Sequence, residues 1–127
     1  MSETVVRTFL DQLAARETDA ALALLDDEVE WRNTGLPTFR GKRVHAMLRD
    51  MERRGIGLAV DWHHVAETGD TVLTDRTDVI SVRSWDTSFA VRGTFLVRDG
   101  RITVWDDAFN WFELLGSGVA GLGRMLR

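Results

Sequence analysis

Apolar residues recur at helical spacing in the first part of the chain. One stripe predicts a helix over residues 3–16, and it consists of Val5, Val6, Phe9, Leu10 and Leu13. Thr18 and the alanine- and leucine-rich run after it predict a second, short helix that ends near Asp26. Another stripe predicts a third helix over residues 42–54, before Gly55, and it consists of Val44, Met47, Leu48 and Met51.

The period changes to two after the third helix. Four strands are expected from residue 56 onward, separated by turn sequences at 67–70, 83–86 and 98–100. A short strand is also expected at 29–33, followed by a loop that holds the only proline. Helices followed by a run of strands predict an α+β fold in one domain spanning residues 1–127. The glycine-rich segment 114–127 is expected to be a loosely held cover at the mouth of a pocket.

Two opposite charges interrupt an apolar row in the segment TDRTDVISV. In a strand, Arg76 and Asp78 point to the same side as Val72, Ile80 and Val82, because side chains alternate between the two faces. Burying an Arg and an Asp on an apolar face is costly unless they are paired and hydrogen-bonded. Their position therefore predicts a partner or a functional role.

Two further strands place polar groups among apolar ones. In VEWRN, Trp31 and Asn33 share a face with Val29. In RITVWDDAFN, one face holds Trp105, Asp107 and Phe109, and the other face holds Ile102, Val104, Asp106 and Ala108. The economical explanation is that the polar groups of the three strands meet at one site.

These segments resemble the limonene-1,2-epoxide hydrolases, which belong to the nuclear transport factor 2-like superfamily. The most specific matches are VEWRNTGLP, DRTDVI, GTFLVRDGRI and WDDAFNWFELL, in that order along the chain. The resemblance implies a strongly curved mixed β-sheet that forms a cone and packs against three N-terminal helices. It also implies an enzyme that converts an apolar epoxide to a vicinal diol without a metal or organic cofactor.

The same resemblance suggests roles for individual residues. The family carries an Arg-x-Asp on one strand and a second Asp on the last strand, which are Arg76, Asp78 and Asp107 here. It implies that Asp107 is the base and Asp78 the acid, with Arg76 between them at hydrogen-bonding distance from both. A family Tyr-x-Asn motif helps to hold the attacking water, and this chain has Trp31 and Asn33 at those positions.

Composition excludes several other kinds of partner. A net charge of −4 and a pI near 5.3 argue against a nucleic-acid binder, which needs a basic surface. No run of residues approaches the length of a membrane span, and an acidic N-terminal sequence without cysteine fits a cytoplasmic location. The outer face of the sheet is expected to be too apolar to remain in water and to form a homodimer, through Leu73, Val79, Ala90 and Leu96.

Two alternatives to an epoxide hydrolase remain open from the sequence. The same fold supports ketosteroid-isomerase-like or polyketide-cyclase-like proton-transfer enzymes, which do not need an Arg between two Asp residues. It also supports small domains that bind hydrophobic ligands. The segment DWHH is suggestive of a metal site, but alternation sends Asp61 and His63 to one face and Trp62 and His64 to the other. A metal site is therefore not expected.

Overall fold

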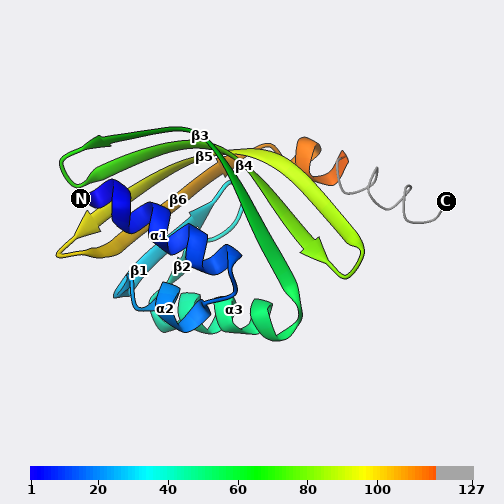
Figure 1. Ribbon diagram of the computed structural model, residues 1–127, viewed down its shortest axis with the longest axis horizontal. Coiled ribbons are helices and arrows are strands. Elements are labelled where there is room, and N and C mark those ends of the chain that lie inside the picture. Colours follow the sequence, from blue (N-terminus) through cyan, green and yellow to red (C-terminus); the bar gives the residue numbers. More distant parts are fainter. Residues whose placement is uncertain (117–127) are drawn as a thin grey trace.

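The computed structural model describes residues 1–116 and has helices and strands in an α+β arrangement (Figure 1). In chain order the elements are α1 (Ser2–Ala14), α2 (Thr18–Leu22), β1 (Leu25–Asn33), β2 (Phe39–Arg40), α3 (Lys42–Arg53), β3 (Ile56–Thr68), β4 (Thr71–Val82), β5 (Trp85–Arg98) and β6 (Arg101–Phe109). A further helical turn covers residues 111–116. The expected α+β class, the three N-terminal helices and the four long strands are confirmed.

The six strands form one curved sheet in the order β2-β1-β6-β5-β4-β3 (Figure 1). Strands β1 and β6 are parallel and the other pairs are antiparallel, so the sheet is mixed, as expected. The parallel pairing places Trp31 beside Trp105 and Asn33 beside Asp107. Strands far apart in the sequence therefore bring the predicted polar residues into neighbouring positions.

The hydrophobic core lies between the helices and the inner face of the sheet. Helix α1 buries Val6, Phe9 and Leu10 against strand residues that include Phe95 and Trp105. Phe9 meets Trp105 edge-on, with ring centroids 5.0 Å apart. Complete burial of one such side chain stabilises the fold by about 1.5–3 kcal/mol. None of the helices in residues 1–116 is long and apolar enough to cross a membrane.

Two boundaries differ from the expectation. Helix α2 ends at Leu22 rather than near Asp26, because Leu25 already belongs to β1, is buried in the core and lies beside Ile102 of β6. The expected loop over residues 34–41 contains the short strand β2, which pairs with β1. In both places pairing with the sheet overrides the local preference of the sequence.

The face predicted for Ile102 was wrong. It was expected on the outer face with Val104, but it is fully buried in the core. Val104 pairs with Leu96 and Ile102 pairs with Val97, so Thr103 is an extra residue in β6. Such a β-bulge interrupts the alternation of side chains and turns Ile102 inward.

A second bulge corrects the prediction for the two adjacent histidines. Trp62 pairs with Arg76 and His64 pairs with Asp75, which leaves His63 as the extra residue of β3. Both imidazoles therefore contact outer-face residues of β4: His63 Nε2 lies 2.8 Å from Thr77 Oγ1, and His64 Nδ1 lies 3.2 Å from Asp75 Oδ2. Within residues 1–116, no three His, Asp or Glu side chains come together in a way that could hold a metal ion.

Candidate active site

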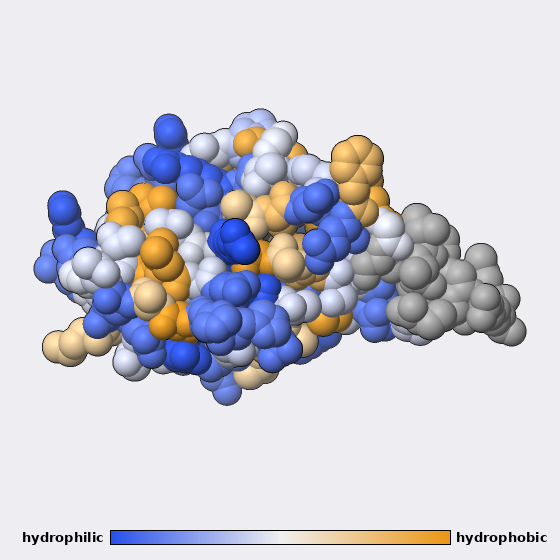
Figure 2. Space-filling model, turned by 90° about the horizontal axis from the view of Figure 1, so that it is seen from above, coloured by the Kyte–Doolittle hydropathy of each residue, from blue (hydrophilic) through white to orange (hydrophobic). Residues whose placement is uncertain are grey.

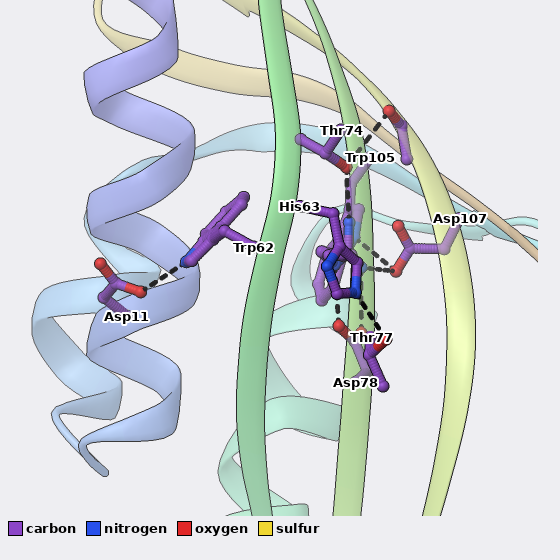
Figure 3. A network of polar contacts seen from close by, with 10 residues as sticks. Asp11, Trp62, His63, Thr74, Thr77, Asp78, Trp105 and Asp107 are labelled. Carbon is purple, nitrogen blue, oxygen red and sulfur yellow. Dashed lines mark hydrogen bonds and ion pairs between the residues drawn. The ribbon is translucent and has the colours of Figure 1, made fainter.

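Arg76 lies at the centre of a buried polar cluster. Its guanidinium has no exposed surface and donates from Nε to Asp78 Oδ1 at 2.9 Å and from Nη2 to Asp78 Oδ2 at 3.1 Å. Nη2 also donates to Asp107 Oδ2 at 2.9 Å. Asp78 and Asp107 are themselves buried, and Figure 3 shows their carboxyl groups converging on one place. The predicted contact between Arg76 and both carboxyl groups is confirmed.

The geometry of the sheet explains how Arg76 reaches Asp107. Strand β5 lies between β4 and β6, so the two residues are separated by two strand spacings of about 4.8 Å each. On β5 the intervening residue is Gly93, which pairs with Thr74 on one side and with Asp107 on the other. Because Gly93 has no side chain, the long Arg76 side chain can pass over the backbone of β5.

For both Asp107 and Arg76, burial and the neighbouring opposite charge shift the pKa in opposite directions. Burial raises the pKa of Asp107 to about 6, against the charge of Arg76, and the nearby Asp78 adds to the increase. Burial acts to lower the pKa of Arg76, but Asp107 and Asp78 outweigh it and raise that pKa above its ordinary value. Arg76 therefore stays charged, and Asp107 changes its charge close to neutral pH.

Three residues of the cluster were missed by the sequence analysis. Trp105 Nε1 donates to Asp107 Oδ2 at 2.9 Å, and Thr74 Oγ1 accepts from Arg76 Nη1 at 2.9 Å. The third is Gly93. The sequence does indicate where Trp105 and Thr74 point. Trp105 lies two residues before Asp107, and Thr74 lies two residues before Arg76, so each shares a face with its charged neighbour. Neither side chain is charged, so neither stands out from the residues around it in the sequence.

The two carboxyl groups border a cavity of about 330 Å³. Its walls are mostly apolar and include Leu10, Leu13, Leu48, Met51, Leu58, Ile80, Phe89 and Phe109. A wider and more open groove of about 1180 Å³ runs along α3, but it contains none of the predicted site residues. The inner cavity is therefore the one that combines the charged cluster with space for an apolar ligand.

Trp31 and Asn33 line this cavity beside Asp107. The Trp31 ring stacks on Trp105, with centroids 4.4 Å apart and an interplanar angle of 14°. Among the described residues, Trp31 Nε1 and Asp107 Oδ1 are buried polar atoms without a hydrogen-bond partner. Unpaired buried groups are rare in native proteins, so a free donor and a free acceptor on neighbouring strands indicate a place for a polar ligand. Four of the five predicted site residues thus line the cavity, and the fifth, Arg76, contacts two of them.

The segment after β6 also contributes to the cavity. Leu114 lies on its wall, and the Leu114 carbonyl accepts a hydrogen bond from Thr87 Oγ1 at 2.7 Å. Trp111 Nε1 donates to the Thr34 carbonyl at 2.7 Å. The expected cover spans residues 114–127, and its part from 117 onward lies outside the described residues.

Comparison with known proteins identifies the family. Residues 2–119 match the family model described as the limonene-1,2-epoxide hydrolase catalytic domain. The chain belongs to the limonene-1,2-epoxide hydrolase family. It is 36% identical over 118 residues to the epoxide hydrolase EphG of Mycobacterium tuberculosis (strain ATCC 25618 / H37Rv). The aligned region covers 92% of this chain and 78% of the relative.

Solved structures agree with membership in the limonene-1,2-epoxide hydrolase family. A limonene-1,2-epoxide-hydrolase-like epoxide hydrolase from M. tuberculosis superimposes with a TM-score of 0.93 at 33% identity, over 98% of this chain and 94% of that one. A hypothetical protein from Catenulispora acidiphila with a ketosteroid isomerase-like fold has a TM-score of 0.77 at 12% identity, over 91% and 92% of the two chains. The second likeness concerns the fold alone. The family match and the two M. tuberculosis relatives together support epoxide hydrolysis as the activity of this chain.

Proposed function

We propose that Arg76, Asp78 and Asp107, with Asn33 and Trp31, catalyse the addition of water to an apolar epoxide in one step and without a cofactor. The observation that carries this proposal is the bridge that Arg76 makes between two buried carboxyl groups that line an apolar cavity. One carboxylate and one carboxylic acid are the two groups that a concerted ring opening needs.

In the proposed step, Asp107 takes a proton from a water molecule while the water oxygen attacks a carbon of the epoxide. The carbon–oxygen bond of the ring breaks, and the leaving oxygen takes the proton of Asp78. The product is a vicinal diol, Asp107 now holds the proton from the water, and Asp78 has lost its own. A proton then passes from Asp107 to Asp78, directly or through solvent, and restores the starting state. Arg76 holds both carboxyl groups throughout, since its donors contact each of them. The assignment of base and acid follows the family resemblance.

The other functions considered for this fold lack such support. An isomerase or cyclase that moves a proton within its substrate needs a base and a hydrogen-bond donor for the developing oxyanion, but it does not need an Arg that bridges two acids. A domain that only binds an apolar ligand gains nothing from a buried charged cluster, which is costly to desolvate. The cluster therefore favours hydrolysis of an epoxide over both alternatives.

The rate of hydrolysis should depend on pH through Asp107. Because burial raises the pKa of Asp107 to about 6, a base at this position is active above that pH and protonated below it. We expect kcat/KM to rise with pH and to level off above an apparent pKa near 6. The measurement is diol formation between pH 4.5 and 8, with the fastest substrate among terpene, cycloalkene, styrene and fatty-acid epoxides. A rate that falls through the same range would contradict this assignment and would mean that Asp107 is the acid and Asp78 the base.

The second testable residue is Trp31, at the position of the family tyrosine. We infer that its indole N–H, which has no partner among the described residues, donates to the attacking water. Asn33 supplies a second polar contact from the same strand. Trp31→Phe removes the donor and should slow turnover about 5- to 150-fold, which corresponds to one buried hydrogen bond. Trp31→Tyr should retain more activity, because the hydroxyl is also a donor.

Trp62→Phe is the matched control for these variants, since its indole donates to Asp11 Oδ1 at 3.2 Å, away from the cavity. Turnover of Trp62→Phe should equal that of the parent enzyme. If Trp31→Phe were as active as the parent, Trp31 would be part of the wall only.

We propose further that the chain is a cytoplasmic homodimer, the location being in keeping with its lack of cysteine. Leu73 and Leu96, on the outer face of the sheet, expose 52% and 39% of their surface. The view from above onto the strands has apolar patches between hydrophilic side chains (Figure 2). Light scattering should give twice the mass of one chain at micromolar concentration, and Leu73→Glu should lower it. A monomer at that concentration contradicts the proposal.

A further inference from the structure

Arg76 has one arm that the two carboxyl groups do not use. Nε and Nη2 bind Asp78 and Asp107, whereas Nη1 donates to Thr74 Oγ1 at 2.9 Å. The Thr74 hydroxyl donates in turn to the Gly93 carbonyl at 3.4 Å. Thr74 is buried, and it is not among the described residues that line the cavity. It therefore contacts Arg76 without being positioned to contact the substrate.

We propose that Thr74 is a positioning residue, which fixes the rotation of the Arg76 guanidinium so that Nη2 bridges Asp78 and Asp107. This inference rests on the proposed roles of those three residues. A guanidinium is planar, so holding Nη1 on one side determines where Nη2 points on the other. Without an acceptor at Nη1, the side chain can turn toward Asp78, which already binds it through two oxygens.

Gly93 supports the same inference independently. A Cβ atom on Gly93 would lie 2.5 Å from Arg76 Nη1, 2.7 Å from Thr74 Oγ1 and 2.9 Å from Asp107 Oδ1. The backbone of Gly93 is not in the left-handed region, so a glycine is needed here for the space it leaves and not for its backbone conformation. The position at which Thr74 meets Arg76 thus exists because β5 has a glycine there.

The chemistry of a hydroxyl suits this position. Thr74 offers a neutral acceptor, so it satisfies a buried N–H of Arg76 without adding a third negative charge to the cluster. A carboxylate at this place would compete with Asp107 for the guanidinium. A valine would have nearly the same shape but would leave Nη1 without its acceptor.

The test compares Thr74→Val with Thr74→Ser, which restores the hydroxyl, and with Thr77→Val on the outer face of the same strand. We expect Thr74→Val to lower kcat for an epoxide about 5- to 150-fold, the effect of one lost hydrogen bond to a charged group, with KM nearly unchanged. The low-pH limb of its rate profile should move to higher pH, because a displaced Arg76 lowers the pKa of Asp107 less. Thr74→Ser should recover both properties, and Thr77→Val should match the parent.

The outcomes separate this inference from the proposed site. If Asp107→Asn is inactive while Thr74→Val keeps the kcat and pH profile of the parent, Thr74 has no positioning role and the triad stands. Thr74→Ser as impaired as Thr74→Val also overturns the inference, since the hydroxyl is then not what matters. If Asp107→Asn stays active, the proposed triad itself is wrong. Circular dichroism and thermal unfolding verify that each variant is folded.

Discussion

Asp107→Asn is expected to lower kcat by about 10²- to 10⁴-fold, the usual contribution of a general base. The amide cannot take a proton from water, but its oxygen can still accept the hydrogen bonds that Arg76 and Trp105 donate to Oδ2. The fold should therefore persist while the chemistry is lost. Asp78→Asn should have a loss of similar size, because the amide cannot protonate the leaving oxygen. Diol formation under saturating substrate measures both.

Asp106→Asn is the matched control for this prediction. Asp106 is the neighbouring residue on β6, and it pairs with Thr94 on the outer face of the sheet. Its substitution removes the same charge from the same strand without touching the cavity, so we expect the activity of the parent. Asp107→Asn with nearly the activity of the parent would show that another group activates the water.

Arg76→Met is expected to have the largest effect on stability. The variant leaves two buried carboxyl groups without their common cation, and removing one partner of a buried ion pair typically costs about 3–5 kcal/mol. Arg76 acts to lower the pKa of Asp107, so without it that pKa rises further above the unfolded-state value than the value of about 6 in the parent. The loss is therefore greatest at neutral pH and smaller near pH 3, below the ordinary pKa of 3.8, where Asp107 is mostly protonated in both the folded and the unfolded state. Urea unfolding at the two pH values measures the difference.

Arg92→Met provides the control for charge and length. Arg92 lies on β5 with its side chain exposed on the outer face. Its substitution should change the free energy of unfolding by less than about 0.5 kcal/mol, as is usual for surface positions. If Arg76→Met unfolds with the same midpoint as the parent at neutral pH, the ion pairs of Arg76 do not contribute to the free energy of unfolding as predicted.

Alternation of side chains predicted that the charged residues share the inner face of the sheet, and the family resemblance predicted that Arg76 lies between the two carboxyl groups. Arg76, Asp78 and Asp107 occupy alternate positions among apolar residues, and a sheet with one buried face leaves such residues few other places to point. The same argument failed at Ile102 and His64. A β-bulge adds one residue to one strand, and the sequence around Thr103 or His63 does not indicate that a bulge occurs there.

The roles of Thr74 and Gly93 were beyond the sequence for another reason. Alternation places Thr74 on the inner face, but only the register of β4, β5 and β6 puts it opposite Gly93 and puts Gly93 opposite Asp107. Register depends on pairing between strands and not on either strand alone. Helix α2 is a similar case, because its end is set by the burial of Leu25 in the sheet.

The most direct test of one-step attack by water is a single turnover in oxygen-18 water with enzyme in excess over epoxide. If Asp107 activates water and no ester forms, the diol of the first turnover carries one labelled oxygen, and mass spectrometry finds none in Asp78 or Asp107. An attacking carboxylate would instead give its own unlabelled oxygen to the diol and take up the label on hydrolysis of the ester. Label in the peptide that contains Asp78 or Asp107, with an unlabelled first-turnover diol, would contradict the mechanism.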